Sequence, residues 1–151
     1  MRRLLGALAL ALALTGCGEE DPGPTSTPSD TATSSPADRP AADPVLVHAT
    51  AAGGETAATV TRLPDDDALA AYVEQFRGGL PGLVTEAADG IAVRDGEVLA
   101  AQVVMIGCDV PPGAALTGTG DAVAIVADKV TSPLKQCLAA VTTVALAAVP
   151  A

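Results

Sequence analysis

Few side chains in this 151-residue chain have the chemistry of a catalytic group, and their spacing matches no familiar catalytic arrangement. His48 is the single histidine, and Ser132 is the single serine after residue 44. Ser132 precedes a proline and has no Gly-x-Ser-x-Gly elbow around it, so it lacks the turn that exposes a nucleophile. A hydrolase triad would need both residues aligned with a third group. We therefore expect no catalytic residue and interpret His48 as a surface residue of a strand.

Metal and phosphate ligands are also poorly represented. Residues 65–67 are three consecutive aspartates, whereas a calcium loop alternates its acids so that they converge on one ion. These acids stand just before a stretch of helical spacing, which suits the capping of a helix N-terminus. One histidine and separated cysteines give no zinc spacing, and residues 118–120 (Gly-Thr-Gly) lack the third glycine of a phosphate loop. We expect neither a metal nor a cofactor.

The N-terminus has the organisation of an export signal. A basic start at residues 1–3 is followed by an uninterrupted apolar run over residues 4–14. This run is too short to cross a bilayer, because a spanning helix takes about 20 residues. A basic start before a short apolar run is typical of a cleaved signal peptide rather than of a membrane helix.

The apolar run ends in Leu14-Thr15-Gly16-Cys17. This tetrapeptide resembles the lipobox of bacterial prolipoproteins, in which an aliphatic residue, a small residue, and Gly or Ala precede a lipidated Cys. The resemblance implies cleavage between Gly16 and Cys17 and a diacylglyceryl group on the Cys17 sulfur. Two acyl chains anchor a protein stably, whereas one binds only marginally. The alternative is an ordinary secretory signal, but the acids at residues 19–21 leave no convincing second cleavage site.

A polar segment separates this anchor from the rest of the chain. Residues 18–44 hold six Pro, eight Ser or Thr, six acids and one Arg, with Ala as the only apolar type. Such a segment buries too little apolar surface to offset its ordering entropy, so we expect a disordered tether spanning roughly 30 Å. The predicted organisation is a signal peptide (residues 1–16), a lipidated tether (17–44) and one domain (45–151).

Composition excludes several kinds of partner. The net charge is −10, and loss of the two arginines in residues 1–16 takes it to −12. An acidic surface without a basic stripe repels nucleic acid phosphates. With no Trp, one Tyr and one Phe, the chain offers few aromatic platforms for gripping sugars. The acidic surface also repels anionic lipids, so membrane attachment is expected to depend on the lipid on Cys17.

Cys108 and Cys137 remain as an even pair in an oxidising compartment, which favours a disulfide over two free thiols. The bridge would close a loop of about 30 residues and stabilise the fold by about 3.5 kcal/mol in the chain-entropy model. The close Cys-x-x-Cys spacing of a redox-active pair is missing. We therefore predict a structural disulfide.

A candidate interaction loop adjoins the first of these cysteines. It contains Asp109, Val110, Pro111 and Pro112. A Pro-Pro segment held by a disulfide loses little entropy on binding, which suits a recognition or inhibitory loop. The alternative is a turn that needs these residues for its own shape.

The hydrophobic pattern predicts the elements that position these residues. The main helix is expected to begin at residues 65–67 and to stop at Gly78-Gly79, and residues 81–88 are a candidate second, short helix. The result is an α+β domain with an antiparallel sheet of about five or six strands and one main helix packed on it. Strand patterns occur at residues 45–50 and 57–63 around a Gly-rich turn, at 91–94 and 97–106 around Asp95-Gly96, and at 114–117, 122–127 and 138–149. Residues 98–106, apart from Gln102, and residues 138–149 are apolar on both faces, as central strands are.

The domain's two-cysteine, Ala-rich, strand-dominated pattern is similar to that of small uncharacterised lipoproteins of high-GC Gram-positive bacteria, a resemblance that implies no activity. We expect a non-enzymatic binding or accessory module, held at the cell membrane through Cys17 on the extracytoplasmic side, with a partner in the envelope. The alternative is a tethered protease inhibitor or protease-complex subunit that uses residues 108–113. An enzymatic function is the third hypothesis, because the residues of the domain provide no recognisable set of nucleophile, base and oxyanion donors.

Overall fold

The computed structural model describes residues 43–151. The predicted signal peptide, the lipidation site at Cys17 and most of the tether lie outside the described residues, so they stay predictions. Within residues 43–151, no helix is long and apolar enough to cross a membrane.

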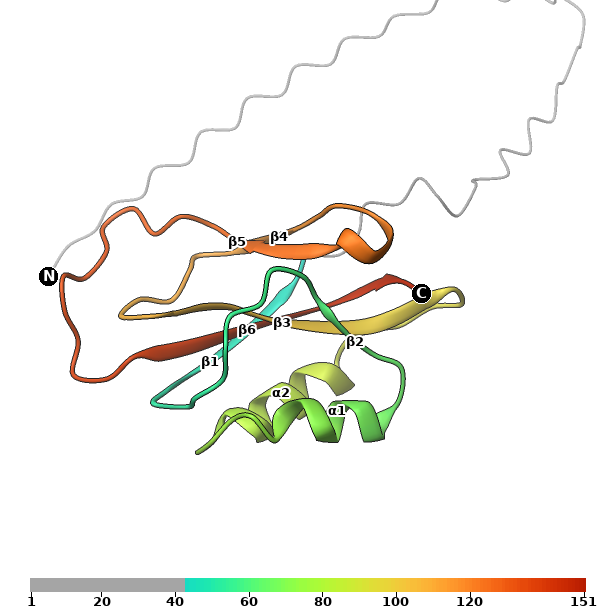
Figure 1. Ribbon diagram of the computed structural model, residues 1–151, viewed down its shortest axis with the longest axis horizontal. Helices are drawn as coiled ribbons and strands as arrows, with labels where there is room; N and C mark the ends of the chain where they lie inside the picture. The colour runs from blue at the N-terminus through green and yellow to red at the C-terminus, as the bar shows by residue number, and fades with distance from the viewer. Residues whose placement is uncertain (1–42) are drawn as a thin grey trace, which may run out of the picture. The chain divides into compact units, whose positions relative to one another are not determined.

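A four-stranded antiparallel sheet forms the middle layer of the domain (Figure 1). Its central strands are β3 (Glu97–Gly107) and β6 (Val141–Pro150), which pair along nearly their whole length. The edge strands are β1 (Val45–Thr50), which pairs with β6, and β2 (Thr61–Leu63), which pairs with β3. The strand order is therefore β1-β6-β3-β2.

Two helices, α1 (Asp66–Val73) and α2 (Leu80–Asp89), cover one face of this sheet (Figure 1). Leu80, Val84 and Ala88 of α2 are buried, because residues four apart share one side of a helix. They join the largest apolar cluster of the described residues. Its other buried members are Ala52, Leu63, Phe76, Ala101, Val103, Val144 and Leu146.

A hairpin covers the opposite face of the sheet (Figure 1). Its strands β4 (Ala114–Thr117) and β5 (Ala124–Ala127) form a separate two-stranded sheet, with a short 3-10 helix, η2 (Gly120–Ala122), in the connection. Ile125 of this hairpin is buried with Ala145 and Ala147 of β6. Both faces of β3 and β6 are thus covered, as the apolar pattern predicted. The last strand begins at Val141 rather than at Leu138, which lies before it and is fully exposed.

Gln102 is the polar exception on β3, and it connects three parts of the domain. Its side-chain amide donates a hydrogen bond to the Ala57 carbonyl oxygen at 2.7 Å. The Ile125 backbone N–H donates to the Gln102 side-chain oxygen, also at 2.7 Å. One buried side chain therefore ties the sheet both to the hairpin and to the segment before β2.

The strand pairing differs from the expectation in three places. Residues 45–50 and 57–63 do not form a hairpin, because β1 and β2 lie at opposite edges of the sheet. Residues 91–94 are not a strand, although the turn at Asp95-Gly96 is present and Gly96 has a φ of 80°. The six strands form two sheets rather than one. The long partner β6 pairs with all six residues of β1, which three-residue β2 could not do.

The helices also differ from the expectation of one main helix. The candidate second helix is present as α2 and is the more deeply buried of the two. Helix α1 ends at Val73 rather than at Gly78, because the chain after it pairs with the turn that follows β1. There the Arg77 N–H donates to the Ala52 carbonyl at 2.8 Å, and Phe76 forms a β-bridge with Gly53.

Replacing Gln102 by leucine should lower the free energy of unfolding by about 2 kcal/mol, because the buried Ile125 N–H would lose its partner and the part-buried hydrogen bond to the Ala57 carbonyl would also be lost. Urea unfolding followed by circular dichroism measures this loss. Gln75→Leu is the matched control, since the Gln75 amide donates to the Tyr72 carbonyl at an exposed position. The control should change stability by less than about 0.5 kcal/mol. Equal effects of the two changes would contradict the role of Gln102.

Candidate functional site

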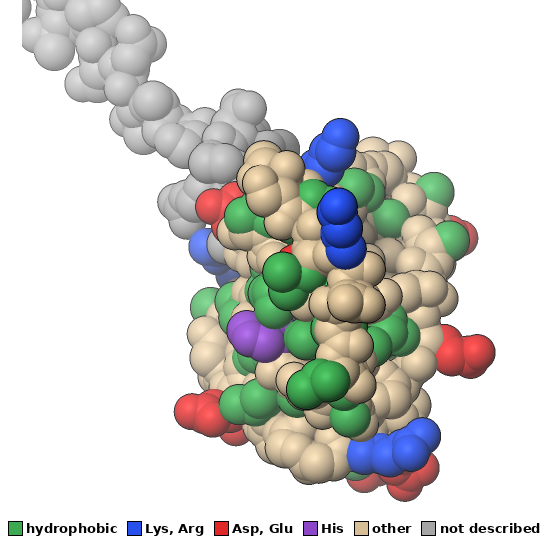
Figure 2. Space-filling view, turned by 90° about the vertical axis from the view of Figure 1, so that its left-hand side faces the viewer, with side chains coloured by type: hydrophobic (Ala, Val, Ile, Leu, Met, Phe, Trp, Pro, Cys, Tyr) green, Lys and Arg blue, Asp and Glu red, His purple; other side chains and the backbone are tan. Residues whose placement is uncertain are grey.

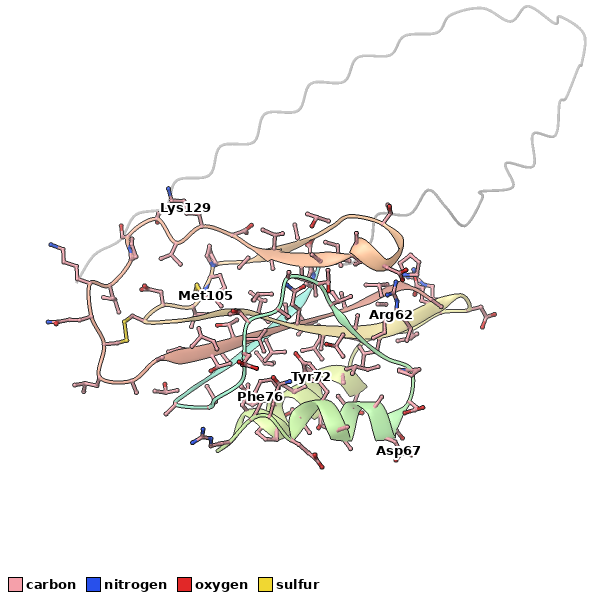
Figure 3. All side chains as sticks on the ribbon, in the orientation of Figure 1. Arg62, Asp67, Tyr72, Phe76, Met105 and Lys129 are labelled. Carbon is pink, nitrogen blue, oxygen red and sulfur yellow. A yellow bond between two sulfur atoms is a disulfide. The ribbon has the colours of Figure 1, made fainter. Side chains whose placement is uncertain are left out.

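The predicted disulfide between Cys108 and Cys137 is confirmed, with the two Cα atoms 5.3 Å apart (Figure 3). It joins the end of β3 to the segment that precedes β6, across a sequence separation of 29 residues. Two loops, residues 108–113 and 128–140, are thereby held together at one end of the domain. These two loops are called the bridged end from here on.

The predicted interaction loop is braced from within. Both carboxylate oxygens of Asp109 accept a hydrogen bond from the Leu134 N–H, at 3.2 and 3.1 Å. Pro111 is buried, whereas Val110 and Pro112 are exposed. The four residues singled out in the sequence are thus divided: Asp109 and Pro111 shape the loop, and Val110 and Pro112 reach its surface.

The point where the chain enters the domain lies beside the bridged end. The Asp128 N–H donates to the Gly113 carbonyl at 2.9 Å. A Cβ atom on Gly113 would lie 2.6 Å from Asp128 Oδ2, so the Asp128 carboxylate is turned toward the loop. Asp43 and Pro44 line an open hollow of about 470 Å³ together with Pro112, Gly113 and Asp128. The last residues of the tether therefore border the bridged end.

Two leucines of the bridged end stand out among the apolar side chains. Leu134 is 61% exposed and Leu138 is 109% exposed, whereas the other exposed large hydrophobic side chains lie between 37% and 52%. Figure 2 looks onto this end of the domain, where hydrophobic side chains lie at the surface and acidic side chains lie mostly toward its edges. Water thus contacts apolar surface on a segment that the disulfide holds in place.

Both lysines of the chain, Lys129 and Lys135, lie in the same segment. They are exposed and form no ion pair with the described residues, and Lys129 points away from the sheet (Figure 3). Residues 43–151 carry thirteen Asp or Glu against five Lys or Arg, hence a net charge of −8. The sequence analysis did not single out these lysines and leucines. The pattern that could have indicated them is that both lysines of an acidic chain lie close together in the sequence, next to Leu134.

The two residues with nucleophile or base chemistry are separate. His48 is exposed on the edge strand β1, opposite Thr143 of β6. Ser132 is exposed in the bridged end. No hydrogen bond connects the two within residues 43–151. The Thr143 hydroxyl is buried without a hydrogen-bond partner among the described residues.

The aspartate triplet caps a helix, as predicted. The Asp65 carboxylate accepts a hydrogen bond from the Ala68 N–H at 2.8 Å. Asp66 and Asp67 lie in the first turn of α1, where the positive end of the helix dipole favours acids. Across the part of the chain that the structure describes, no group of three or more His, Cys, Asp or Glu is arranged to hold a metal ion.

The Gly-Thr-Gly segment forms the connection of the β4–β5 hairpin rather than a phosphate loop. Gly118 has a φ of 77° and Gly120 a φ of 57°, both in the region that favours glycine. A Cβ atom on Gly118 would collide with the Ala122 carbonyl, whereas a Cβ on Gly120 would meet no atom within 4 Å. The first glycine is therefore required by close backbone contact and the second by conformation alone.

The aromatic pair Tyr72 and Phe76 includes a buried hydroxyl group, which the sequence analysis did not predict. Tyr72 and Phe76 pack edge to face, with ring centroids 5.6 Å apart (Figure 3). The Tyr72 hydroxyl is buried and has no hydrogen-bond partner among the described residues. Burial raises the pKa of this hydroxyl, because the phenolate would be poorly solvated. The ring therefore acts as a core side chain that stays protonated.

Gly118→Ala should lower the free energy of unfolding by about 3 kcal/mol, since a positive φ and a collision with the backbone both oppose the methyl group. Gly120→Ala is the matched control and should cost about 1 kcal/mol, because only its φ opposes the change. Thermal and urea unfolding measure both. A phosphate-dependent rise in the melting temperature of the unaltered protein would contradict the assignment of this segment as a plain turn.

No family model, curated protein or solved structure matches this chain.

Proposed function

We propose that this protein is a lipid-anchored accessory lipoprotein of the cell envelope, whose extracytoplasmic domain acts by binding rather than by catalysis. Cys17 carries the lipid, residues 17–44 form the tether, and the bridged end is the contact surface. The observation that carries this proposal is the exposure of Leu134 and Leu138 on an end that a disulfide holds in place.

The disulfide supports an extracytoplasmic location. Structural disulfides persist in oxidising compartments, whereas cytosolic thiols are kept reduced. Cys108 and Cys137 lie 5.3 Å apart between their Cα atoms, within the usual range for a bridge. This agrees with an export signal at residues 1–16 and with a lipidated N-terminus that directs the domain away from the cytoplasm.

The bridged end supports a binding role. Nearly every residue of 128–140 is exposed, so little apolar packing of its own stabilises this segment. Its conformation depends instead on the disulfide and on the bond from Leu134 to Asp109. A surface that is fixed before contact loses less conformational entropy on binding. Exposed apolar side chains on such a surface are typical of an interaction site.

The alternative function, a tethered protease inhibitor or protease-complex subunit, uses the neighbouring loop. Val110 and Pro112 are exposed there, and Asp109 braces the loop from within. An inhibitor of this kind would lose its effect on an envelope protease when Val110 is replaced by aspartate. Loss of inhibition without loss of contacts at Leu138 would favour this alternative over the wider bridged end.

Lipid anchoring predicts a specific mass for the N-terminal peptide of the membrane-extracted protein. Cys17 should be its first residue, and the peptide should carry the added mass of a diacylglyceryl group. Inhibition of signal peptidase II should leave a precursor that retains residues 1–16. Recovery of the mature protein in the aqueous phase of a detergent separation, with an unmodified Cys17, would overturn this part of the proposal.

Contact through the bridged end predicts where a photo-crosslinking side chain will react in intact cells. Placed at Leu138 in the full chain, it should form lipid or protein adducts. Val126 is the matched control, because it is 52% exposed but lies on β5 in the hairpin. Adducts at Leu138 should clearly exceed those at Val126. Equal yields at the two positions would show that the bridged end is not the contact surface.

A further inference from the structure

We propose that the bridged end docks on an anionic lipid surface, with Leu134 and Leu138 entering the membrane interface and Lys129 and Lys135 lying among the lipid head groups. This inference deepens the proposed function by naming the partner of the bridged end, and it rests on that function for the tether that keeps the domain near a membrane. The docking itself belongs to residues 128–140 and is measurable without the anchor.

The leucines supply the apolar part of this contact. Leu138 is fully exposed and Leu134 is 61% exposed, and both belong to a segment with no secondary structure of its own. A leucine side chain in water gains free energy when it moves into an apolar environment, in proportion to the area it buries. Insertion into the membrane interface removes this area from water without a shaped pocket.

The lysines supply the electrostatic part. Both are exposed, and no ion pair with the described residues neutralises them. Of the nearby acids, Asp109 accepts a hydrogen bond from the Leu134 N–H, and Asp128 is exposed with its carboxylate directed toward Gly113. Lys129 and Lys135 are the only charged side chains between residues 129 and 140, so this stretch around the two leucines is positive. Anionic head groups attract lysines close to a membrane surface.

The net charge of the domain then selects one orientation. With thirteen acids against five basic residues in residues 43–151, most of the surface is repelled by an anionic membrane. Asp66 and Asp67 lie in the first turn of α1, and Figure 3 shows Asp67 at the opposite end of the view from the disulfide. Residues 129–140 thus offer two lysines, next to two exposed leucines, with which the domain can approach such a surface.

The chemistry of the segment favours lipid over a protein partner. Energetic centres of protein interfaces are enriched in Trp, Tyr and Arg, and residues 128–140 contain none of these. None of the hollows lined by Asp43, by Leu63 or by Leu116 includes a residue from 129 to 140. A bilayer with anionic lipids suits this arrangement, because the exposed leucines can enter its acyl-chain region while the lysines contact its negatively charged head groups.

Because the tether keeps the domain close to the membrane, a weak contact between the bridged end and the lipid is sufficient for docking. A tether of the composition of residues 17–44 is expected to reach roughly 30 Å, and it would hold the domain near the lipid surface at an effective concentration on the order of millimolar. The last tether residues, Asp43 and Pro44, border the bridged end, so the chain enters the domain next to the docking surface. Two leucines and two lysines are then enough to seat the domain on the membrane.

Tryptophan fluorescence tests the depth of Leu138 directly, because the chain contains no Trp. The lipidated Leu138→Trp protein is reconstituted in vesicles of equal parts phosphatidylcholine and phosphatidylglycerol. Its emission should shift to shorter wavelength and be quenched by lipids brominated along their acyl chains. The lipidated Val126→Trp protein is the matched control and should emit as an indole in water, quenched by iodide instead. Identical spectra and quenching for the two proteins would overturn the proposal.

Vesicle co-sedimentation tests the native side chains in the whole mature chain made with Cys17→Ser, which has no lipid. Leu134→Ser and Leu138→Ser should each lower the partition coefficient by about tenfold. Leu83→Ser is the control, since Leu83 is 40% exposed on α2, and should leave partitioning unchanged. Lys129→Glu with Lys135→Glu should weaken binding to phosphatidylglycerol vesicles and have little effect with phosphatidylcholine alone. Equal partitioning of all these variants would refute docking.

The two experiments separate this inference from the proposed function. Partitioning of the lipid-free chain that depends on the leucines supports docking even if Cys17 proves unmodified in cells. If the indole of the lipidated Leu138→Trp protein stays in water, lipid anchoring is unaffected but the docking of the bridged end is contradicted. A purified envelope protein that shields this indole from iodide in the absence of lipid would assign the bridged end to a protein and overturn the inference.

Discussion

Ten residue pairs join β3 to β6, and the rest of the domain is arranged around this antiparallel pair. The middle of each strand is buried on both faces, so each face needs its own cover: helices on one side and a hairpin on the other. The edge strands β1 and β2 extend the pair without replacing it. A register slip of one residue between β3 and β6 would exchange the two faces and leave neither layer with a matching surface.

The hairpin layer depends on small side chains and on one polar contact. The sheet residues beneath it include Ala100, Ala145 and Ala147, which bury little area and so contribute little stabilisation each. Gln102 fixes the position of the hairpin on the sheet, because its side-chain amide forms hydrogen bonds with backbone groups of Ile125 in the hairpin and of Ala57. A buried polar group whose partners are present specifies one arrangement of the layers, where alanines alone would allow several.

The sequence was informative wherever a local pattern determines a local structure. Asp65 was expected to cap a helix and does so, and the doubly apolar strands were expected to be central and are. Pairing partners are set by contacts between distant segments, so residues 57–63 were assigned to the wrong neighbour. Helix α1 ends earlier than expected for a similar reason. The β-bridge between Phe76 and Gly53 is a contact between distant segments, and the helical spacing of the apolar residues does not reveal it. The exposure of Leu138 depends on the whole fold and could not be read from its neighbours.

The disulfide has a different role from the apolar layers, and this difference connects the fold to the proposed binding. The core of β3 and β6 ends near residues 107 and 141, and the segment beyond it buries almost no apolar side chain of its own. A segment of that kind would sample many conformations, since little burial opposes its chain entropy. Cys108 and Cys137 remove much of this freedom while leaving the side chains of residues 128–138 in water. A covalent constraint on an exposed segment stabilises a surface rather than a core, and here that surface carries two lysines beside two exposed leucines.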